Sequence, residues 1–483
     1  MENKNFIKSL VSDFAKAPSD TIAFSIYDGK EIKNISYPQF AEDILKAASC
    51  FRNQNIYEQH IALISPNSYD WMVNFFGILA SGNTAVVLNY LLPKHMLQQQ
   101  CIHTDVNAIC CCAEETQNYS DLFDNKIVLS CDYYHSYIPM CIDDISDVSN
   151  DKTLVLMFTS GTTGKSKAVQ LTKGNICSSL ENQISTYTDT LAGVGVKDER
   201  WFFVAPMFHI AILALSFYLL SQAKAICIGR GARYMFMDMP VFNPTHTALV
   251  PAMIESLEKI FKRSPGEERN KYIGSKLRVI ISGGAVLKPA LAQYMMEQGI
   301  ILHSNYGMTE TTGDGMRCLV DSNHNKAIGK LWGDMECCCV DGEILIRSKS
   351  VMKGYYKDPE ETSKIIVDGW LHTGDMGYCD EDGYYYIIGR KKNVIILSNG
   401  ENVNPEEIEA AFGECEAIAE CMVYSDGKGI CADVFANDQN TAVAYIKQYN
   451  ESMPLYRQVY KVNYTDEPLP KNATGKIKRK ENL

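Results

Sequence analysis

The chain has 483 residues, of which 46% are hydrophobic and 22% are charged. This composition is ordinary for a globular protein, and the length predicts about three domains or subdomains. The formal net charge of −12 argues against nucleic acid as the main partner, because a protein that binds a polyanion must concentrate its lysines locally.

The N-terminus and the cysteines indicate a cytoplasmic protein. The first residues lack the apolar segment of a signal peptide. The 17 cysteines include no C-x-x-C pair, and the two triplets at residues 110–112 and 337–339 lack the spacing of zinc ligands. Neighbouring side chains in a strand point to opposite faces, so a triplet does not converge easily on one metal. We therefore expect reduced, mostly buried thiols.

The N-terminal third alternates between strand and helix patterns. Apolar runs predict strands at residues 61–65, 85–88 and 106–111, and longer segments predict helices at residues 69–80 and 95–105. Such alternation is typical of a mostly parallel sheet flanked by helices, and therefore of an α/β fold.

A loop rich in glycine, hydroxyl side chains and lysine follows a predicted buried strand at residues 153–159. Glycines let the backbone approach a ligand closely, and free backbone N–H groups form an anion-binding concavity. A Walker A loop would need glycine where Thr159 stands, five residues before Gly164. The loop is thus a candidate phosphate site of another kind, although its composition also suits a surface turn. Its members are Thr159, Ser160, Gly161, Thr162, Thr163, Gly164, Lys165, Ser166 and Lys167.

Residues 202–223 carry no charge if His209 is neutral, and this length would suffice to span a bilayer. Pro206 and His209 interrupt the segment, so we favour a strand at residues 201–205, a loop and a buried helix at residues 210–221. Peripheral membrane contact remains an alternative.

The series continues with a strand at residues 225–228, a helix at residues 252–262 and a strand at residues 277–281. The last strand leads into a turn that contains Gly284 and Ala285. A turn in this context suits a ligand at the carboxyl end of a parallel sheet.

Two polar segments further along carry candidate ligands. Residues 305–312 place an aromatic ring, a hydroxyl group and a carboxylate beside a glycine, and Glu310 suits Mg²⁺, which prefers one or two carboxylates plus phosphate oxygens. Asp375 follows a glycine and could accept both hydroxyls of a ribose. Taken alone, each segment also suits an ordinary turn.

The remaining sequence changes in texture. Residues 342–347 and 383–389 predict short antiparallel strands, and the polar segment 389–393 is a candidate hinge. The last 90 or so residues predict a small α+β unit with helices at residues 405–412 and 441–449 and strands near Val423 and at residues 432–436. Lys476 lies in a basic tail, where solvated charge is the ordinary interpretation.

The order of these segments resembles the adenylate-forming (AMP-binding) superfamily of acyl-CoA synthetases, stand-alone adenylation domains and luciferases. The resemblance extends from about residue 20 to residue 480. It implies a large domain at residues 1–389, made of two mostly parallel sheets flanked by helices plus a small β-barrel-like subdomain. It also implies a hinge at residues 390–393 and a small mobile α+β domain at residues 394–483.

The resemblance implies a two-step reaction. A carboxylic acid and ATP form an acyl-adenylate and pyrophosphate, and a thiol, usually that of coenzyme A, then displaces AMP. Residues 159–167 would hold the β- and γ-phosphates, and Glu310 would bind Mg²⁺. Thr309 would contact the α-phosphate. The rest of the nucleotide would contact Gly284, Ala285, Asn305, Tyr306, Gly307, Asp375 and Arg390.

Three further roles follow from the same resemblance. Lys476 would bridge the substrate carboxylate and the α-phosphate during adenylation, and the small domain would then rotate about the hinge. That rotation would bring the loop with Ser398, Asn399 and Gly400 towards the thiol. His209 would gate the acyl pocket; because no aspartate follows Phe208, we expect an acid without an α-ammonium group, such as a fatty or aromatic acid.

Some departures leave the acceptor open. Asn393 replaces a common aspartate, where an amide can still hydrogen-bond, and Ala168 replaces a common glycine. The small domain and the region at residues 328–339 are short, and in the family contacts to the coenzyme A nucleotide often lie on this variable surface. The acceptor could therefore be the phosphopantetheine of a separate carrier protein instead of coenzyme A. A nucleotide-binding regulator without turnover and a luciferase-like oxygenase are weaker alternatives.

Overall fold

The structure is a computed structural model that describes residues 5–123, 126–159, 166–191, 194–196, 198–397, 401–471 and 477–480. The chain divides into two compact units. The larger unit comprises Met1–Glu336 and Arg347–Leu371, and the smaller comprises Cys337–Ile346 and His372–Leu483. The smaller unit thus takes in a segment from before residue 372 that contains most of the two strands at Glu336–Val340 and Glu343–Arg347. The predicted hinge at residues 390–393 stays a prediction.

The first sheet of the larger unit has eight strands in the order β14-β13-β12-β11-β9-β10-β1-β2, of which β13 to β1 are parallel and the two edge strands are antiparallel. In that order their bounds are Arg317–Leu319, Ile301–Asn305, Val279–Gly283, His246–Leu249, Arg200–Phe203, Ala225–Ile228, Ile22–Tyr27 and Ile32–Ser36.

The second sheet has seven strands in the order β17-β8-β7-β4-β3-β5-β6. The strands from β7 to β6 are parallel, β8 pairs antiparallel with β7, and β17 pairs antiparallel with β8. In that order their bounds are Gly354–Tyr355, Lys167–Thr172, Thr153–Thr159, Thr84–Val87, His60–Ile64, Val106–Cys111 and Ile127–Ser130. Two sheets dominated by parallel strands confirm the predicted α/β fold class.

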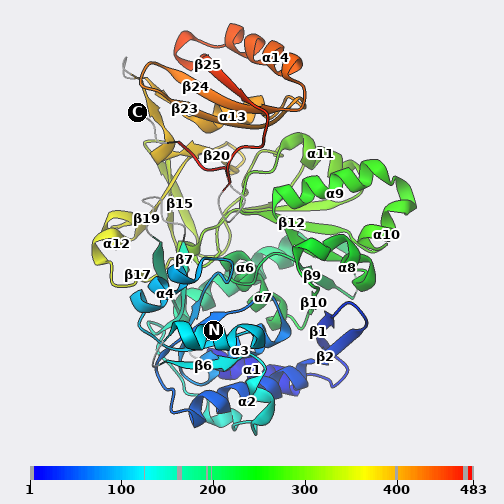
Figure 1. Ribbon diagram of the computed structural model, residues 1–483, viewed down its shortest axis with the longest axis vertical. Helices are drawn as coiled ribbons and strands as arrows, with labels where there is room; N and C mark the ends of the chain where they lie inside the picture. The colour runs from blue at the N-terminus through cyan, green and yellow to red at the C-terminus, as the bar shows by residue number, and fades with distance from the viewer. Residues whose placement is uncertain are drawn as a thin grey trace. The chain divides into compact units, whose positions relative to one another are not determined.

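Helices cover both sheets on both faces (Figure 1). A shared core joins the two sheets through α1 (Phe6–Lys16), α2 (Tyr37–Asn53), α3 (Tyr69–Ala80), α6 (Lys173–Leu191) and α7 (Ile210–Ser221). Alternate side chains of the strands face outwards, where they pack with the remaining helices. These are α8 (Met235–Phe242), α9 (Pro251–Arg263), α10 (Asn270–Ile273) and α11 (Pro289–Glu297) on the first sheet, and α4 (Lys94–His103) and α5 (Thr116–Leu122) on the second.

The uncharged helix α7 is buried almost all round, as expected for a helix packed between layers. Within the described residues, no helix is long and apolar enough to cross a membrane. The sequence prediction of a strand, a loop and a buried helix is therefore confirmed, with α7 beginning and ending at the predicted residues.

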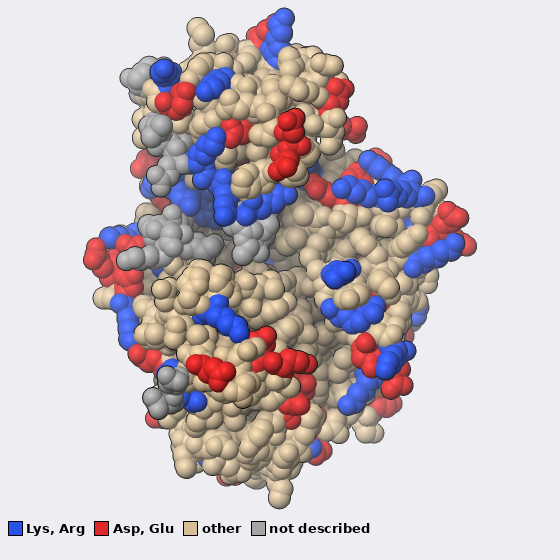
Figure 2. Space-filling view, in the orientation of Figure 1, with Lys and Arg blue, Asp and Glu red and all other residues tan. Residues whose placement is uncertain are grey.

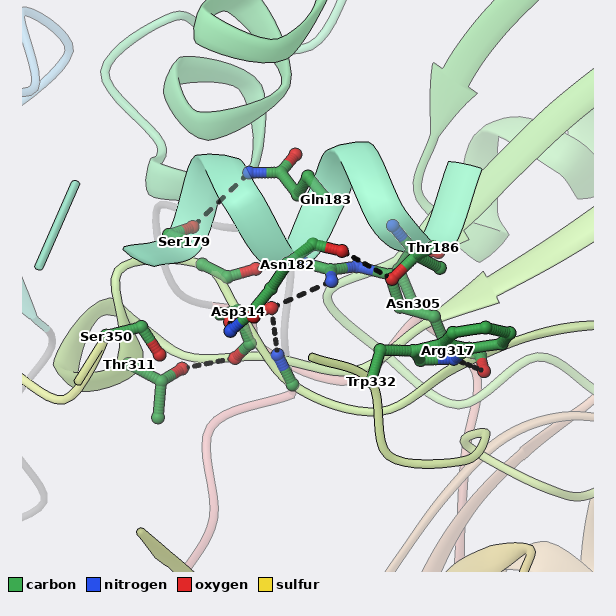
Figure 3. A network of polar contacts seen from close by, with 12 residues as sticks. Ser179, Asn182, Gln183, Thr186, Asn305, Thr311, Asp314, Arg317, Trp332 and Ser350 are labelled. Carbon is green, nitrogen blue, oxygen red and sulfur yellow. Dashed lines mark hydrogen bonds and ion pairs between the residues drawn. The ribbon is translucent and has the colours of Figure 1, made fainter. Parts of the chain in front are cut away.

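Helix α6 packs between the sheets although much of its buried face is polar. Its side chains Ser179, Asn182, Gln183 and Thr186 are buried, and Asn182 Nδ2 donates a hydrogen bond of 2.6 Å to Asp314 Oδ2 (Figure 3). The helix therefore meets the end of the first sheet through hydrogen bonds as well as through apolar contacts.

A third sheet has five strands with antiparallel pairs at β18-β19 and β19-β20. Its strands are β15 (Glu336–Val340), β16 (Glu343–Arg347), β19 (Trp370–Cys379), β18 (Ile366–Val367) and β20 (Tyr385–Arg390), and α12 (Pro359–Ile365) precedes β18.

The C-terminal part of the smaller unit is an α+β layer with its own core. A three-stranded sheet in the order β23-β24-β25 packs with two helices, and a two-stranded β21-β22 ribbon precedes it. The elements are β21 (Ile395–Ile396), β22 (Asn402–Val403), α13 (Pro405–Phe412), β23 (Ile418–Ser425), β24 (Ile430–Ala436), α14 (Gln439–Ser452) and β25 (Val459–Thr465).

The surface carries both signs of charge. Over α9 to α11, acidic and basic side chains are interspersed (Figure 2), and ion pairs join Lys262 to Glu258 and Lys288 to Glu255. All 17 cysteines are free thiols, most of them buried. Among the described residues, no group of three His, Cys, Asp or Glu side chains is placed to hold a metal ion.

Candidate active site

The candidate phosphate loop connects the two strands of a hairpin. Thr159 ends β7 and pairs with Lys167, which begins the antiparallel strand β8. A Walker A loop leads from a strand into a helix, so this connection agrees with the prediction of a different phosphate loop. At its base, Ser166 Oγ donates to the Thr159 carbonyl (3.0 Å) and Gln100 Nε2 donates to Ser166 Oγ (3.2 Å). The predicted ligands at residues 160–165 lie outside the described residues.

Lys167 has an acidic partner that the sequence did not predict. Its Nζ lies 2.5 Å from Glu361 Oε2 and 5.0 Å from the centre of the Tyr355 ring. Lys167, followed by Lys364, lowers the pKa of Glu361 to about 2, so this carboxylate is ionised at neutral pH. Lys167 is thus held beside Tyr355 at the exit of the loop.

The predicted acyl and adenine residues follow neighbouring parallel strands of the first sheet. His209 comes after β9, Gly284 and Ala285 follow β12, and Asn305 ends β13. The strand order β13-β12-β11-β9 and the pairing of Gly283 with Asn305 place these segments at the carboxyl ends of the parallel strands. Ligands of open α/β sheets bind at this end of the strands.

The turn after β13 is packed too tightly for side chains at two glycines. A Cβ atom on Gly307 would lie 2.9 Å from the carbonyl oxygens of Gly313 and Asp314, and one on Gly315 would lie 2.0 Å from the Tyr306 carbonyl oxygen. The backbone of this turn is therefore so closely packed that both positions require glycine. Thr309 and Glu310 begin its 3-10 turn, Thr309–Thr311, and the Tyr306 ring is half-buried.

Glu310 is buried, with 7% of its surface exposed, and its Oε1 accepts a 2.9 Å hydrogen bond from the Tyr355 hydroxyl. Burial, followed by the Glu310 carboxylate, raises the pKa of Tyr355, so the phenol stays a donor. Among the described residues no group of three His, Cys, Asp or Glu side chains includes Glu310, and Mg²⁺ binds through one or two carboxylates with water and phosphate oxygens as its other ligands. Glu310 is therefore a suitable carboxylate for that ion.

The Asn305 side chain serves the interior of the larger unit. Its Nδ2 donates to the Tyr187 hydroxyl (2.7 Å), and its Oδ1 lies 2.6 Å from His303 Nδ1. Burial lowers the pKa of His303 to about 4, so this imidazole is neutral at pH 7. Both ends of the Asn305 amide thus have partners inside the larger unit.

His209 is exposed at the N-terminal end of α7, and its carbonyl accepts from the N–H groups of Ile212 and Leu213. Further along the helix a small, mostly apolar cavity has room for about one water molecule. Its walls include Ser179, Gln183, Ile210, Leu213, Ala214 and Phe217.

Asp375 and Arg390 lie opposite each other in the smaller unit. They pair across β19 and β20, and Arg390 Nε lies 2.7 Å from Asp375 Oδ1. Asp375 is buried, whereas the Arg390 side chain is 43% exposed. The structure therefore brings together the two residues that were predicted to surround the ribose.

The remaining predicted residues, Ser398, Asn399, Gly400 and Lys476, lie outside the described part of the chain. Their neighbours form a connected polar group in the smaller unit. Asn393 Nδ2 donates to Glu406 Oε1 (2.5 Å), and Arg479 Nη2 lies 3.1 Å from the same oxygen and 2.6 Å from Glu409 Oε2. The candidate hinge residue and the C-terminal tail thus share an acidic partner on α13.

The AMP-binding enzyme family matches residues 11–356, which are 346 of the 483 residues. The chain belongs to this family. The resemblance predicted from the order of the motifs is confirmed, and this AMP-binding protein is an enzyme by family.

Two relatives match almost the whole chain of this AMP-binding enzyme. The 2-succinylbenzoate–CoA ligase of Lactococcus lactis is 27% identical, with 94% of this chain and 97% of the relative covered. The long-chain-fatty-acid–CoA ligase of Bacillus subtilis is 26% identical, with coverage of 99% and 94%.

Solved structures have the same fold at lower identity. The o-succinylbenzoate CoA synthetase of Bacillus subtilis, in complex with its acyl-adenylate, gives a TM-score of 0.82 at 23% identity, with 97% of this chain and 96% of that chain covered. An anthranilate CoA ligase in complex with anthranoyl-AMP gives a TM-score of 0.83 at 20% identity, with coverage of 98% and 95%.

Tyr355 and Glu361 were not among the residues predicted from the sequence. Both lie in a segment without strong periodicity, and their partners are far away in the sequence: Glu310 and Lys167. A tyrosine after a glycine is common in turns, so the local sequence contains no signal that would have singled out Tyr355.

Proposed function

We propose that this AMP-binding enzyme is an ATP-dependent acid–thiol ligase that activates a carboxylic acid as an acyl-adenylate and transfers it to coenzyme A. The observation that carries the proposal is the arrangement of Glu310, Tyr355 and Lys167. It connects the candidate metal carboxylate with the exit of the candidate phosphate loop within one unit. Such an arrangement suits a nucleoside triphosphate.

In the proposed first step, an oxygen of the acid forms a bond to the α-phosphorus of ATP while the bond to the pyrophosphate oxygen breaks. Two anions must approach each other, so catalysis depends on positioning and charge neutralisation. The loop at residues 159–167 would hold the leaving pyrophosphate, and Thr309 would contact the α-phosphate. Mg²⁺ on Glu310 would neutralise phosphate charge. In the second step, the thiol sulfur bonds to the acyl carbon, the bond from that carbon to the phosphate oxygen breaks, AMP leaves with the electron pair, and the thiol proton passes to solvent.

The acid is proposed to be fatty or aromatic. His209 precedes a helix whose cavity-lining side chains are mainly apolar, and the described part of the cavity wall contains no charged group to pair an α-ammonium group. The matched relatives are named for an aromatic acid and for long-chain fatty acids, which supports this class. The same relatives are named as CoA ligases, which favours coenzyme A over a carrier protein as the acceptor.

Pyrophosphate release from ATP, measured across a panel of aromatic, short and long-chain acids with and without coenzyme A, tests the proposal. We expect release with at least one acid and formation of its CoA thioester. Release that yields a thioester only with a phosphopantetheinylated carrier protein would replace coenzyme A as the acceptor. A folded enzyme that binds ATP but activates no acid would contradict the proposal.

The cavity along α7 has room for about one water molecule, so only the end of an acyl group would reach into it, and this gives a prediction about acid size. Ala214→Leu adds three carbon atoms to a cavity that has room for only about one water molecule. We expect kcat/KM for the preferred acid to fall about tenfold or more, with KM for ATP unchanged, because misfit of a few methylenes changes discrimination by that order. Steady-state kinetics over acids of increasing size measure the effect.

Ala290→Leu is the matched control, because Ala290 is exposed on α11. It should leave the acid preference unaltered. If Ala214→Leu also keeps the wild-type preference at unchanged thermal stability, the cavity does not receive the acid.

A further inference from the structure

We propose that Tyr355 is a positioning residue that sets the Glu310 carboxylate and the Lys167 ammonium group for the metal–triphosphate complex. This inference rests on the proposed function and goes beyond it by assigning a role to a residue outside the predicted loop and turn. Tyr355 would contact neither the acid nor the reacting phosphorus, and it would act through its two neighbours.

The hydroxyl end of Tyr355 fixes Glu310. The phenol donates to Oε1 at 2.9 Å, and the two side chains are both buried, at 7% exposure each. A hydrogen bond to an ionised acceptor is stronger than one between neutral groups, and burial reduces competition from water. The bond therefore restricts rotation of the carboxylate, whose orientation decides how its oxygens meet a metal ion.

The ring of Tyr355 meets Lys167. The ammonium nitrogen lies 5.0 Å from the ring centre while the same nitrogen pairs with Glu361, and only 14% of the Lys167 side chain is exposed. A cation over an aromatic face is attracted by the ring quadrupole. One side chain thus contacts the candidate metal carboxylate at one end and a candidate phosphate cation along its face.

The backbone around Tyr355 is held on two sides. Strand β17 pairs with β8, so Tyr355 lies opposite Val169, two residues after Lys167. On the other side the Met352 N–H donates to the Glu310 carbonyl at 2.7 Å. Main-chain hydrogen bonds therefore connect the segment that carries Tyr355 to the strand of Lys167 and to the turn of Glu310. Removal of the Tyr355 hydroxyl would leave these bonds in place.

Tyr355→Phe removes the hydroxyl and keeps the ring. The readout is the gain in ATP affinity that Mg²⁺ gives, measured by calorimetry as the ratio of the Kd in EDTA to the Kd in excess Mg²⁺. We expect this ratio to fall about tenfold relative to the wild-type enzyme, the size of a hydrogen bond to a charged group. The Kd in EDTA should change little, because the ring still lies under Lys167.

Tyr356→Phe is the matched control. The neighbouring tyrosine donates to Asp105 Oδ2 at 2.8 Å and is not part of the proposed site, so its loss should leave the ratio at the wild-type value. Thermal denaturation compares the folding of the variants. A generally structural effect would alter both affinities together and would overturn the proposal.

A double-mutant cycle with Glu310→Gln decides whether Tyr355 acts through Glu310. We expect Tyr355→Phe to have no further effect on the ratio in the Glu310→Gln background. Independent, additive effects would overturn the proposal, as would a wild-type ratio in folded Tyr355→Phe. Because the readout is nucleotide binding without acid, it decides the role of Tyr355 even if no acid is activated, which would contradict the proposed function alone.

Discussion

Replacing Lys476 with alanine is expected to lower acid-dependent pyrophosphate release by at least about 100-fold, while thioester formation from a supplied acyl-adenylate changes little. A cation that touches both reactants is most useful where charge is densest, which is the adenylation transition state. Loss of one such electrostatic contact typically costs 10²–10³ in rate. Rapid-quench assays of the two half-reactions measure the split.

The C-terminal tail offers a matched control. Lys471 and Ile477 form an antiparallel bridge, and the Lys478 N–H donates to the Pro470 carbonyl at 2.8 Å, so the residues on either side of 472–476 pair with each other. Lys478→Ala removes an exposed charge two residues from Lys476 and should leave both half-reactions near wild type. Equal loss of both steps in Lys476→Ala would contradict a role that is specific to adenylation.

The most regular helices could be predicted from the sequence. The segments at residues 69–80, 210–221 and 405–412 are helices with those same bounds, because apolar runs, a preceding turn or an early proline define them locally. The order of the motifs also identified the family, since several weak local patterns in a fixed order are far more specific than any one of them. Both predictions rest on local patterns or on the order of motifs along the chain.

What could not be predicted depends on partners far apart in the chain. Helix α6 was missed because it buries Asn182, Gln183 and Thr186, so its apolar residues do not mark the buried face. The pairing of Lys167 with Glu361 spans 194 residues, and no spacing rule covers such a contact. A polar helix in the interior needs a polar partner, and this partner is only visible in three dimensions.

The polar partner of α6 is Asp314, and its ion pair with Arg317 leads to a prediction about stability. Arg317→Met is expected to lower the free energy of unfolding by about 3–5 kcal/mol, because it leaves a buried carboxylate without its cation. Arg317 Nη1 lies 2.7 Å from Asp314 Oδ1, and both side chains are at most 2% exposed. Asn182 and the Gly315 N–H also bond to Asp314, as Figure 3 shows for Asn182. Chemical denaturation followed by fluorescence measures the change.

The pH dependence of the variant distinguishes charge burial from lost packing. Burial already raises the pKa of Asp314 above its usual value of 3.8, against the opposing effect of Arg317. Removing the arginine should raise it further. A carboxyl whose folded pKa exceeds its unfolded pKa destabilises the fold above the folded pKa, and stability returns as the pH falls through it. The defect of Arg317→Met should therefore shrink from pH 7 towards pH 4.

The double variant Arg317→Met/Asp314→Asn completes the test, because it removes the charge and keeps an amide oxygen as the acceptor for one of the two neighbouring donors. It should be more stable than Arg317→Met at pH 7 and should lose the pH dependence of that variant. The Thr311 hydroxyl donates to the main-chain carbonyl of Asp314, so the residue that pairs with Arg317 is also bonded to the turn that carries Glu310. A double variant as unstable as Arg317→Met at both pH values would mean that packing of the arginine, and not its charge, holds this turn.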